Sequence, residues 1–125
     1  MNTKIKNAIV GLALGLFAAG SVNARPLECD DLRTVAKNAA VVLDYGDTKN
    51  GIRMFNDSLK AQGLNNMQRQ IYTGMVLYLE VATEDNTMDG AVEIMTDACQ
   101  ANGVTWTLKT LAETGKKYMI KNNIK

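Results

Sequence analysis

The sequence contains no histidine, and it has only one proline, one tryptophan and two cysteines among its 125 residues. The absence of histidine excludes histidine bases, histidine metal ligands and histidine-ligated haem. Most familiar hydrolase sites are excluded with it, because they use histidine to activate a nucleophile. A hydrolase that works through two carboxylates is an alternative, since Asp and Glu together number 13. No pair of them stands out by position, so we expect a non-catalytic protein without a metal or cofactor.

Residues 1–24 have the three parts of a secretory signal peptide: a short basic start, an apolar run and the small-residue ending VNA. The apolar run, residues 8–20, is shorter than the roughly 20 residues that a membrane-spanning helix needs. We therefore predict cleavage between Ala24 and Arg25 rather than a membrane anchor. The remaining chain, residues 25–125, is predicted to be one small domain that is periplasmic or secreted and carries no stable membrane anchor.

The near balance of acidic and basic residues limits the kinds of partner that the protein is expected to bind. The signal peptide contains two of the 14 basic residues, so 12 basic residues face 13 acidic ones after cleavage. Proteins that bind nucleic acids or anionic membranes need a basic surplus. We therefore expect another protein as the partner, and no nucleic acid.

The two cysteines, Cys29 and Cys99, are predicted to form a disulfide, because an even count in an oxidising compartment is typical of a covalent bridge. Lipidation of Cys29 is disfavoured, since RPLE separates it from the cleavage site. A nucleophilic role is disfavoured too, because the sequence has no histidine to activate the thiol. The predicted bond closes a loop of 70 positions and would stabilise the domain by about 4 kcal/mol on the chain-entropy model.

Apolar residues recur at intervals of three and four, which is typical of helices with one buried face. We predict an all-α domain of about five short helices, at about 28–44, 48–62, 66–84, 88–102 and 105–120. The expected inward residues include Cys29, Leu32, Ala36, Ala39, Leu43, Ile52, Phe55, Leu59, Met67, Ile71, Met75, Tyr78, Leu79, Ala82, Met88, Ala91, Val92, Met95, Cys99, Leu108, Leu111, Ala112, Gly115 and Met119. Glycines 46, 63 and 103 are expected to end helices. We predict no strand, although the β-branched residues of the segment GVTWT favour a briefly extended backbone at the start of the last helix.

The segment DNTMDG, residues 85–90, matches the first half of a calcium-binding EF-hand loop. The acidic ligand due at position twelve falls on Thr96, however, and Met88 occupies a position that is usually polar. The simpler interpretation is that Asn86 or Thr87 caps the following helix. We therefore expect no metal here.

Four acidic residues, Asp85, Asp89, Glu93 and Asp97, repeat every four positions, and no Lys or Arg lies between positions 69 and 109. Like charges at this spacing destabilise an isolated helix. Two interpretations fit. The simpler one is an internal contact with the lysine-rich C-terminal helix; the other is a docking surface for a cationic partner.

The segment LECDDL near Cys29, together with DACQ around Cys99, resembles the small acid-stress chaperones of the bacterial periplasm. That resemblance implies a short helical domain with one disulfide between an early helix and a later one, and a chaperone function. This chain departs from the pattern in its longer cysteine spacing and in the extra helix after Cys99.

The function expected from these features is that of a protein-binding domain, in the form of a stress chaperone. An alternative is a periplasmic inhibitor, or a phage-type exclusion factor, that acts on a cationic cell-wall enzyme. The two differ in the pH at which they act, because a chaperone of this kind works when its carboxylates are protonated.

Overall fold

The computed structural model describes residues 27–45 and 47–125, so the predicted signal peptide and its predicted cleavage site between Ala24 and Arg25 lie outside the described residues. The described chain is all-α, as predicted, and it contains no strand. Its elements are α2 (Cys29–Ala39), the 3₁₀-helix η1 (Ala40–Tyr45), α3 (Thr48–Ala61), α4 (Asn66–Ala82), α5 (Met88–Asn102) and α6 (Val104–Lys121).

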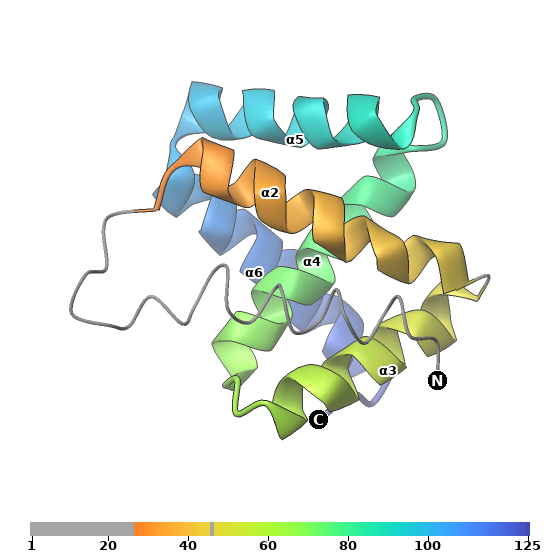
Figure 1. The fold of residues 1–125 in the computed structure, drawn as a ribbon. Helices are drawn as coiled ribbons and strands as arrows, with labels where there is room; N and C mark the ends of the chain where they lie inside the picture. The colour runs from red at the N-terminus through yellow and green to blue at the C-terminus, as the bar shows by residue number, and fades with distance from the viewer. Residues whose placement is uncertain (1–26, 46) are drawn as a thin grey trace.

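The helices form two packed pairs with α3 at one end (Figure 1). Helices α2 and α5 lie side by side and run in opposite directions. Helices α4 and α6 cross each other beneath this pair. Helix α3 lies near the C-terminus, and the Arg53 side chain donates a hydrogen bond to the carbonyl of Asn122 at 2.9 Å. The C-terminal tail is therefore tied to α3.

Two glycines let the backbones of α4 and α6 touch. A Cβ atom placed on Gly74 would lie 1.9 Å from the carbonyl oxygen of Leu111, and one placed on Gly115 would lie 1.8 Å from that of Gln70. No side chain fits in either position, because such distances are far inside van der Waals contact. Gly115 was expected to face inward, and its partner Gly74 completes a reciprocal contact at the crossing point.

Helix ends follow the capping chemistry of the sequence. The Asp47 side chain accepts a hydrogen bond from the amide of Lys49 at the start of α3, and Thr87 accepts one from the amide of Gly90 at the start of α5. The cap at Thr87 confirms the simpler interpretation of DNTMDG. Gly63 and Gly103 follow α3 and α5 with φ of 89° and 93°, a conformation that favours glycine. The third predicted stop, Gly46, lies outside the described residues.

The first helix differs from its predicted form at its C-terminal end. The α-helix ends at Ala39 and continues as a 3₁₀-helix, in which three residues make a turn. This change of period places Val42 in the core and leaves Leu43 only half-buried. The prediction of Leu43 as an inward residue was therefore only approximate.

The segment GVTWT is helical from Val104 onward and not extended, so α6 begins about one residue before the predicted start. Thr107 is buried, and its hydroxyl donates to the carbonyl of Gly103 at 2.8 Å, which gives this buried hydroxyl a hydrogen-bond partner. Packing of the following turns of α6 on α4 thus overrides the local β-propensity of this segment.

The core contains most of the residues expected to face inward. Phe55 of α3 and Tyr72 of α4 meet edge to face, with ring centroids 6.0 Å apart. Met67 is an exception: it was expected inward, but its side chain is 58% exposed. Met67 lines a hollow between α4 and α6, on the part of α4 that precedes the crossing of these two helices at Gly74. Within the described ranges, no helix is both long and apolar enough to cross a membrane.

Candidate protein-binding surface

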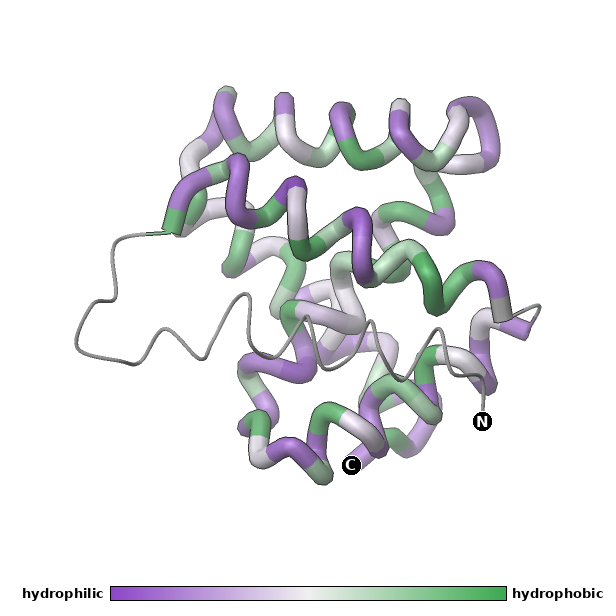
Figure 2. The backbone as a smooth tube through the Cα atoms, viewed as in Figure 1, coloured by the Kyte–Doolittle hydropathy of each residue, from purple (hydrophilic) through white to green (hydrophobic). Residues whose placement is uncertain are grey.

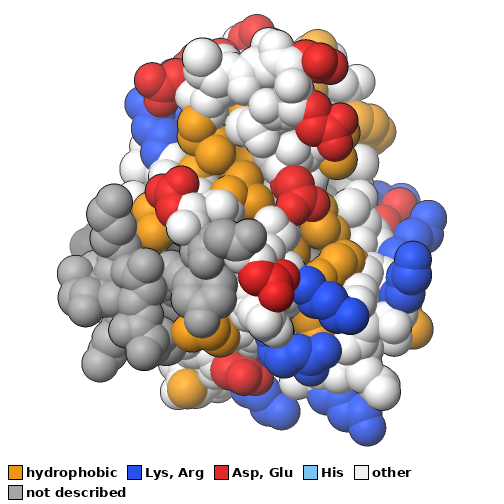
Figure 3. Space-filling model, turned by 90° about the vertical axis from the view of Figure 1, so that its right-hand side faces the viewer, with side chains coloured by type: hydrophobic (Ala, Val, Ile, Leu, Met, Phe, Trp, Pro, Cys, Tyr) orange, Lys and Arg blue, Asp and Glu red, His pale blue; other side chains and the backbone are white. Residues whose placement is uncertain are grey.

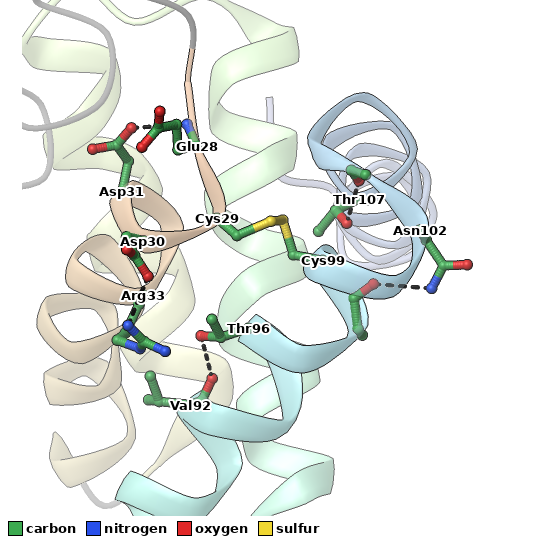
Figure 4. Close-up of a disulfide and its surroundings, with 12 residues drawn as sticks. Glu28, Cys29, Asp30, Asp31, Arg33, Val92, Thr96, Cys99, Asn102 and Thr107 are labelled. Carbon is green, nitrogen blue, oxygen red and sulfur yellow. Dashed lines mark hydrogen bonds and ion pairs between the residues drawn. A yellow bond between two sulfur atoms is a disulfide. The ribbon is translucent and has the colours of Figure 1, made fainter.

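The disulfide joins Cys29, at the start of α2, to Cys99, near the end of α5 (Figure 4). The two Cα atoms are 5.7 Å apart, a separation typical of disulfides. The predicted pairing is therefore confirmed. In this form neither sulfur is a nucleophile, and the bond fixes the antiparallel register of the two helices.

Arg33 lies one turn after Cys29 on α2 and forms an ion pair with Glu93 of α5. Its Nε lies 2.9 Å from Oε1 of Glu93, and a second nitrogen donates to Oε2 at 3.1 Å. Another nitrogen of the guanidinium contacts Asp30 at 2.7 Å (Figure 4). The hydrogen bond to Glu93 is the main cause of a raised pKa for Arg33, and the carboxylates of Glu93, Asp30 and Asp97 add to it while burial opposes it. Arg33 therefore stays charged and partly neutralises this end of α5.

We define the acidic face as the side chains of Asp85, Asp89, Glu93 and Asp97. All four are exposed. Three of them, Asp89, Glu93 and Asp97, belong to α5, whose buried residues are Ala91, Val92, Met95, Thr96 and Cys99. Hydrophilic segments recur along the outer side of this helix (Figure 2). Asp85 precedes α5 and lies in the turn that follows α4, so the four-residue spacing does not place it on the same helix.

The simpler interpretation of these acids, an internal contact with the lysines of the C-terminal helix, is not what the described residues show. No ion pair within 4 Å joins the acidic face to a lysine of α6 in residues 27–45 and 47–125; Glu93 pairs with Arg33 instead. Two lysines of α6, Lys109 and Lys116, line the hollow between α4 and α6 instead. Three of the four carboxylates therefore face solvent without an ion-pair partner among the described residues.

An apolar groove of about 540 Å³ lies between α4, α5 and α6, and we call it the α4–α5–α6 groove. Its position is set by the crossing of α4 and α6, because Gly74 and Leu111 of that contact both line it. Its lining residues are Gly74, Leu77, Tyr78, Val81, Ala82, Asp85, Asn86, Ile94, Thr110, Leu111 and Thr114. Asp85 is the only charged residue among them. Because Asp85 also belongs to the acidic face, the groove and the acidic face share this residue.

Two large apolar side chains at the groove are exposed, Val81 to 64% and Ile94 to 39%. Neither exposure was predicted from the sequence. The segment GMVLYLEVA is apolar almost all round, a pattern that favours a fully buried central helix. Helix α4 is central, but apolar residues of its last turn lie outside the core. The sequence contains more apolar residues in this segment than the core can bury, and this surplus could have indicated an apolar groove at the surface.

The face that includes the turn between α4 and α5 carries both apolar and charged side chains (Figure 3). Hydrophobic side chains form a band across it. Most of the acidic side chains lie in its upper part, and most of the Lys and Arg side chains lie in its lower and right-hand parts. The arrangement offers one surface with an apolar band and separated charges, which is typical of recognition by shape and charge.

Two tyrosines, Tyr72 and Tyr118, have raised pKa values. Burial raises the pKa of Tyr72, which is completely buried. Burial also raises the pKa of Tyr118, with a further rise from Glu80 and an opposing effect from Arg53. Both phenols are therefore protonated at neutral pH.

In the part of the chain that the structure describes, no cluster of three Cys, Asp or Glu side chains is arranged to hold a metal ion.

No family model, curated protein or solved structure matches this chain. The function of the surface must therefore be inferred from its own geometry and charge.

Proposed function

We propose that this chain is an exported, non-catalytic protein-binding domain whose acidic face docks a cationic partner protein. The observation that carries the proposal is the exposure of Asp85, Asp89 and Asp97 without ion-pair partners among the described residues. Within α5, Asp89 and Asp97 also lie four residues on either side of Glu93, a spacing at which like charges oppose helix formation. A cationic partner would remove this repulsion on binding and would be steered to the surface by long-range attraction.

Export is part of the proposal. The disulfide between Cys29 and Cys99 is typical of proteins in oxidising compartments, and residues 1–24 have the pattern of a signal peptide. The periplasm or the exterior of the cell is therefore the proposed location. N-terminal sequencing of the exported protein should start at Arg25, and a mature chain that retains Met1 would contradict this.

The docking proposal is tested with a cationic muramidase as the probe. We expect the oxidised protein to bind it at neutral pH, with an affinity that falls by about tenfold or more between about 50 and 200 mM salt, because several exposed charges contribute. Isothermal titration calorimetry measures both values. Binding of this probe would also support the more specific role of an inhibitor or phage-type exclusion factor.

A pair of charge reversals locates the binding surface. Asp89→Lys with Glu93→Lys should abolish binding of the muramidase. The matched control, Asp57→Lys with Glu113→Lys, changes the net charge equally but alters exposed positions on α3 and α6. Binding that survives the first pair, or that both pairs weaken equally, would contradict a role for the acidic face.

The stress-chaperone form of the proposal has one observation in its favour. The ion pair between Arg33 and Glu93 joins two helices, and acid removes it when Glu93 is protonated, whereas the nearby disulfide keeps the helices attached. Full protonation of the acids would take residues 25–125 from a net charge of −1 to about +12. The purified protein should then suppress the aggregation of client proteins at about pH 2 to 3, as measured by light scattering. No effect on scattering at that pH would rule this form out.

A further inference from the structure

We propose that the α4–α5–α6 groove binds the apolar side of a basic amphipathic helix that belongs to the partner protein. This inference rests on the proposed function, because it assigns the apolar half of the same binding surface. The groove supplies burial, and the acidic face beside it supplies attraction for Lys and Arg residues.

The shape of the groove favours helix side chains. Leu77 and Val81 enter from α4, Ile94 from α5 and Leu111 from α6, so three helices converge on one apolar hollow. Exposed apolar residues that gather in a hollow are typical of binding sites, whereas scattered ones are ordinary. Hollows of this kind between helices take amphipathic helices, which insert residues spaced three, four and seven apart.

The charges at the groove select the sign of the occupant. Asp85 lines one end of it, and the stretch of 39 residues from position 70 to position 108 contains six acidic residues and no Lys or Arg. A basic helix in the groove would pair with Asp85 and would be attracted by the net negative charge of this stretch, whereas an acidic helix would be repelled. An anionic lipid or fatty acid is disfavoured, because no cationic side chain lines the groove among the described residues.

The test uses two synthetic peptides of identical Leu and Lys composition. In one, the Leu residues fall on one side of a helix; in the other, a scrambled order spreads them all round. Calorimetric titration of the oxidised protein at neutral pH should show the amphipathic peptide binding at least about tenfold more tightly, since burial of one Leu-sized side chain corresponds to about that factor.

Two exposed groove positions provide the variants. Val81→Gln with Ile94→Gln should lower the affinity for the amphipathic peptide to that of the scrambled one. Met67→Gln is the matched control, because Met67 lies on the same helix as Val81 and is 58% exposed, but outside the groove. It should leave both affinities unchanged. In methyl NMR spectra, the signals of Leu77, Val81 and Ile94 should shift on addition of the amphipathic peptide.

The outcomes separate this inference from the proposed function. Equal affinities for the two peptides, no binding of either, or an unchanged preference in the Val81 and Ile94 variant would overturn the groove assignment. The acidic face would still stand in each case if binding of the cationic muramidase depends on salt and on Asp89 and Glu93. If muramidase binding depends on neither, the proposed function fails whatever the peptides show.

Discussion

The two helix pairs of this fold are held together by different means. Helices α4 and α6 touch through their backbones at Gly74 and Gly115, so their contact depends on the absence of side chains. Helices α2 and α5 are joined through side chains, by the disulfide and by the ion pair of Arg33. The first contact is sensitive to any added volume, and the second to reduction and to pH.

The proposed binding surface lies where these two pairs meet. The groove is built on the crossing of α4 and α6, whereas most of the acidic face belongs to α5, which the disulfide holds in place. A rigid crossing preserves the shape of the groove. A covalent tether keeps a strongly acidic helix attached to the domain in spite of its own charge repulsion.

Loss of the disulfide should have the largest effect on stability. Cys29→Ala with Cys99→Ala should lower the free energy of unfolding by about 4 kcal/mol, because the bond closes a loop across most of the domain. Guanidinium denaturation followed by circular dichroism measures it. Hydrogen exchange should accelerate in α2 and α5 more than at the crossing of α4 and α6. Uniform acceleration in all helices would show that the two pairs are not separate units of stability.

The glycine crossing should come next in size. Gly74→Ala places a Cβ atom 1.9 Å from the carbonyl oxygen of Leu111, and separation of the helices should cost about 3 kcal/mol of unfolding free energy. Gly90→Ala is the matched control on α5, where the nearest atom, the Thr87 hydroxyl, would be 3.2 Å away. Its change should stay within about 1 kcal/mol, since improved helix propensity offsets the tight contact. A stabilised Gly74 variant would contradict backbone contact at the crossing.

The same contrast explains what the sequence could predict. Spacing of apolar residues and capping side chains depend on one helix at a time, so the helices and the cap at Thr87 followed from them, while the cysteine count gave the disulfide. The crossing and the groove depend on which sides of two helices meet, and one periodic pattern contains no such information. The role of Gly74 in the crossing was therefore not predicted, because this glycine begins the apolar segment GMVLYLEVA. The same segment favoured burial of Val81, which is exposed.

The sequence also left open which cation pairs with the acidic face. Its spacing was visible in the sequence, but its partner was not, since the lysine-rich segment and Arg33 were both available cations. The antiparallel register set by Cys29 and Cys99 brings Arg33 opposite Glu93, a consequence of the fold rather than of any local pattern.

The ion pair itself should have the smallest effect on stability and a clear effect on binding. Arg33→Gln should lower the melting temperature only slightly, because exposed ion pairs contribute little. It should also tighten binding of the cationic muramidase severalfold, since Arg33 is the cation paired with the acidic face. Lys37→Gln, on the exposed side of the same helix, removes an equal charge and should have a weaker effect on both quantities. If Arg33→Gln weakens binding or destabilises the domain as much as loss of the disulfide does, the ion pair is a structural element and the acidic face acts mainly within the fold.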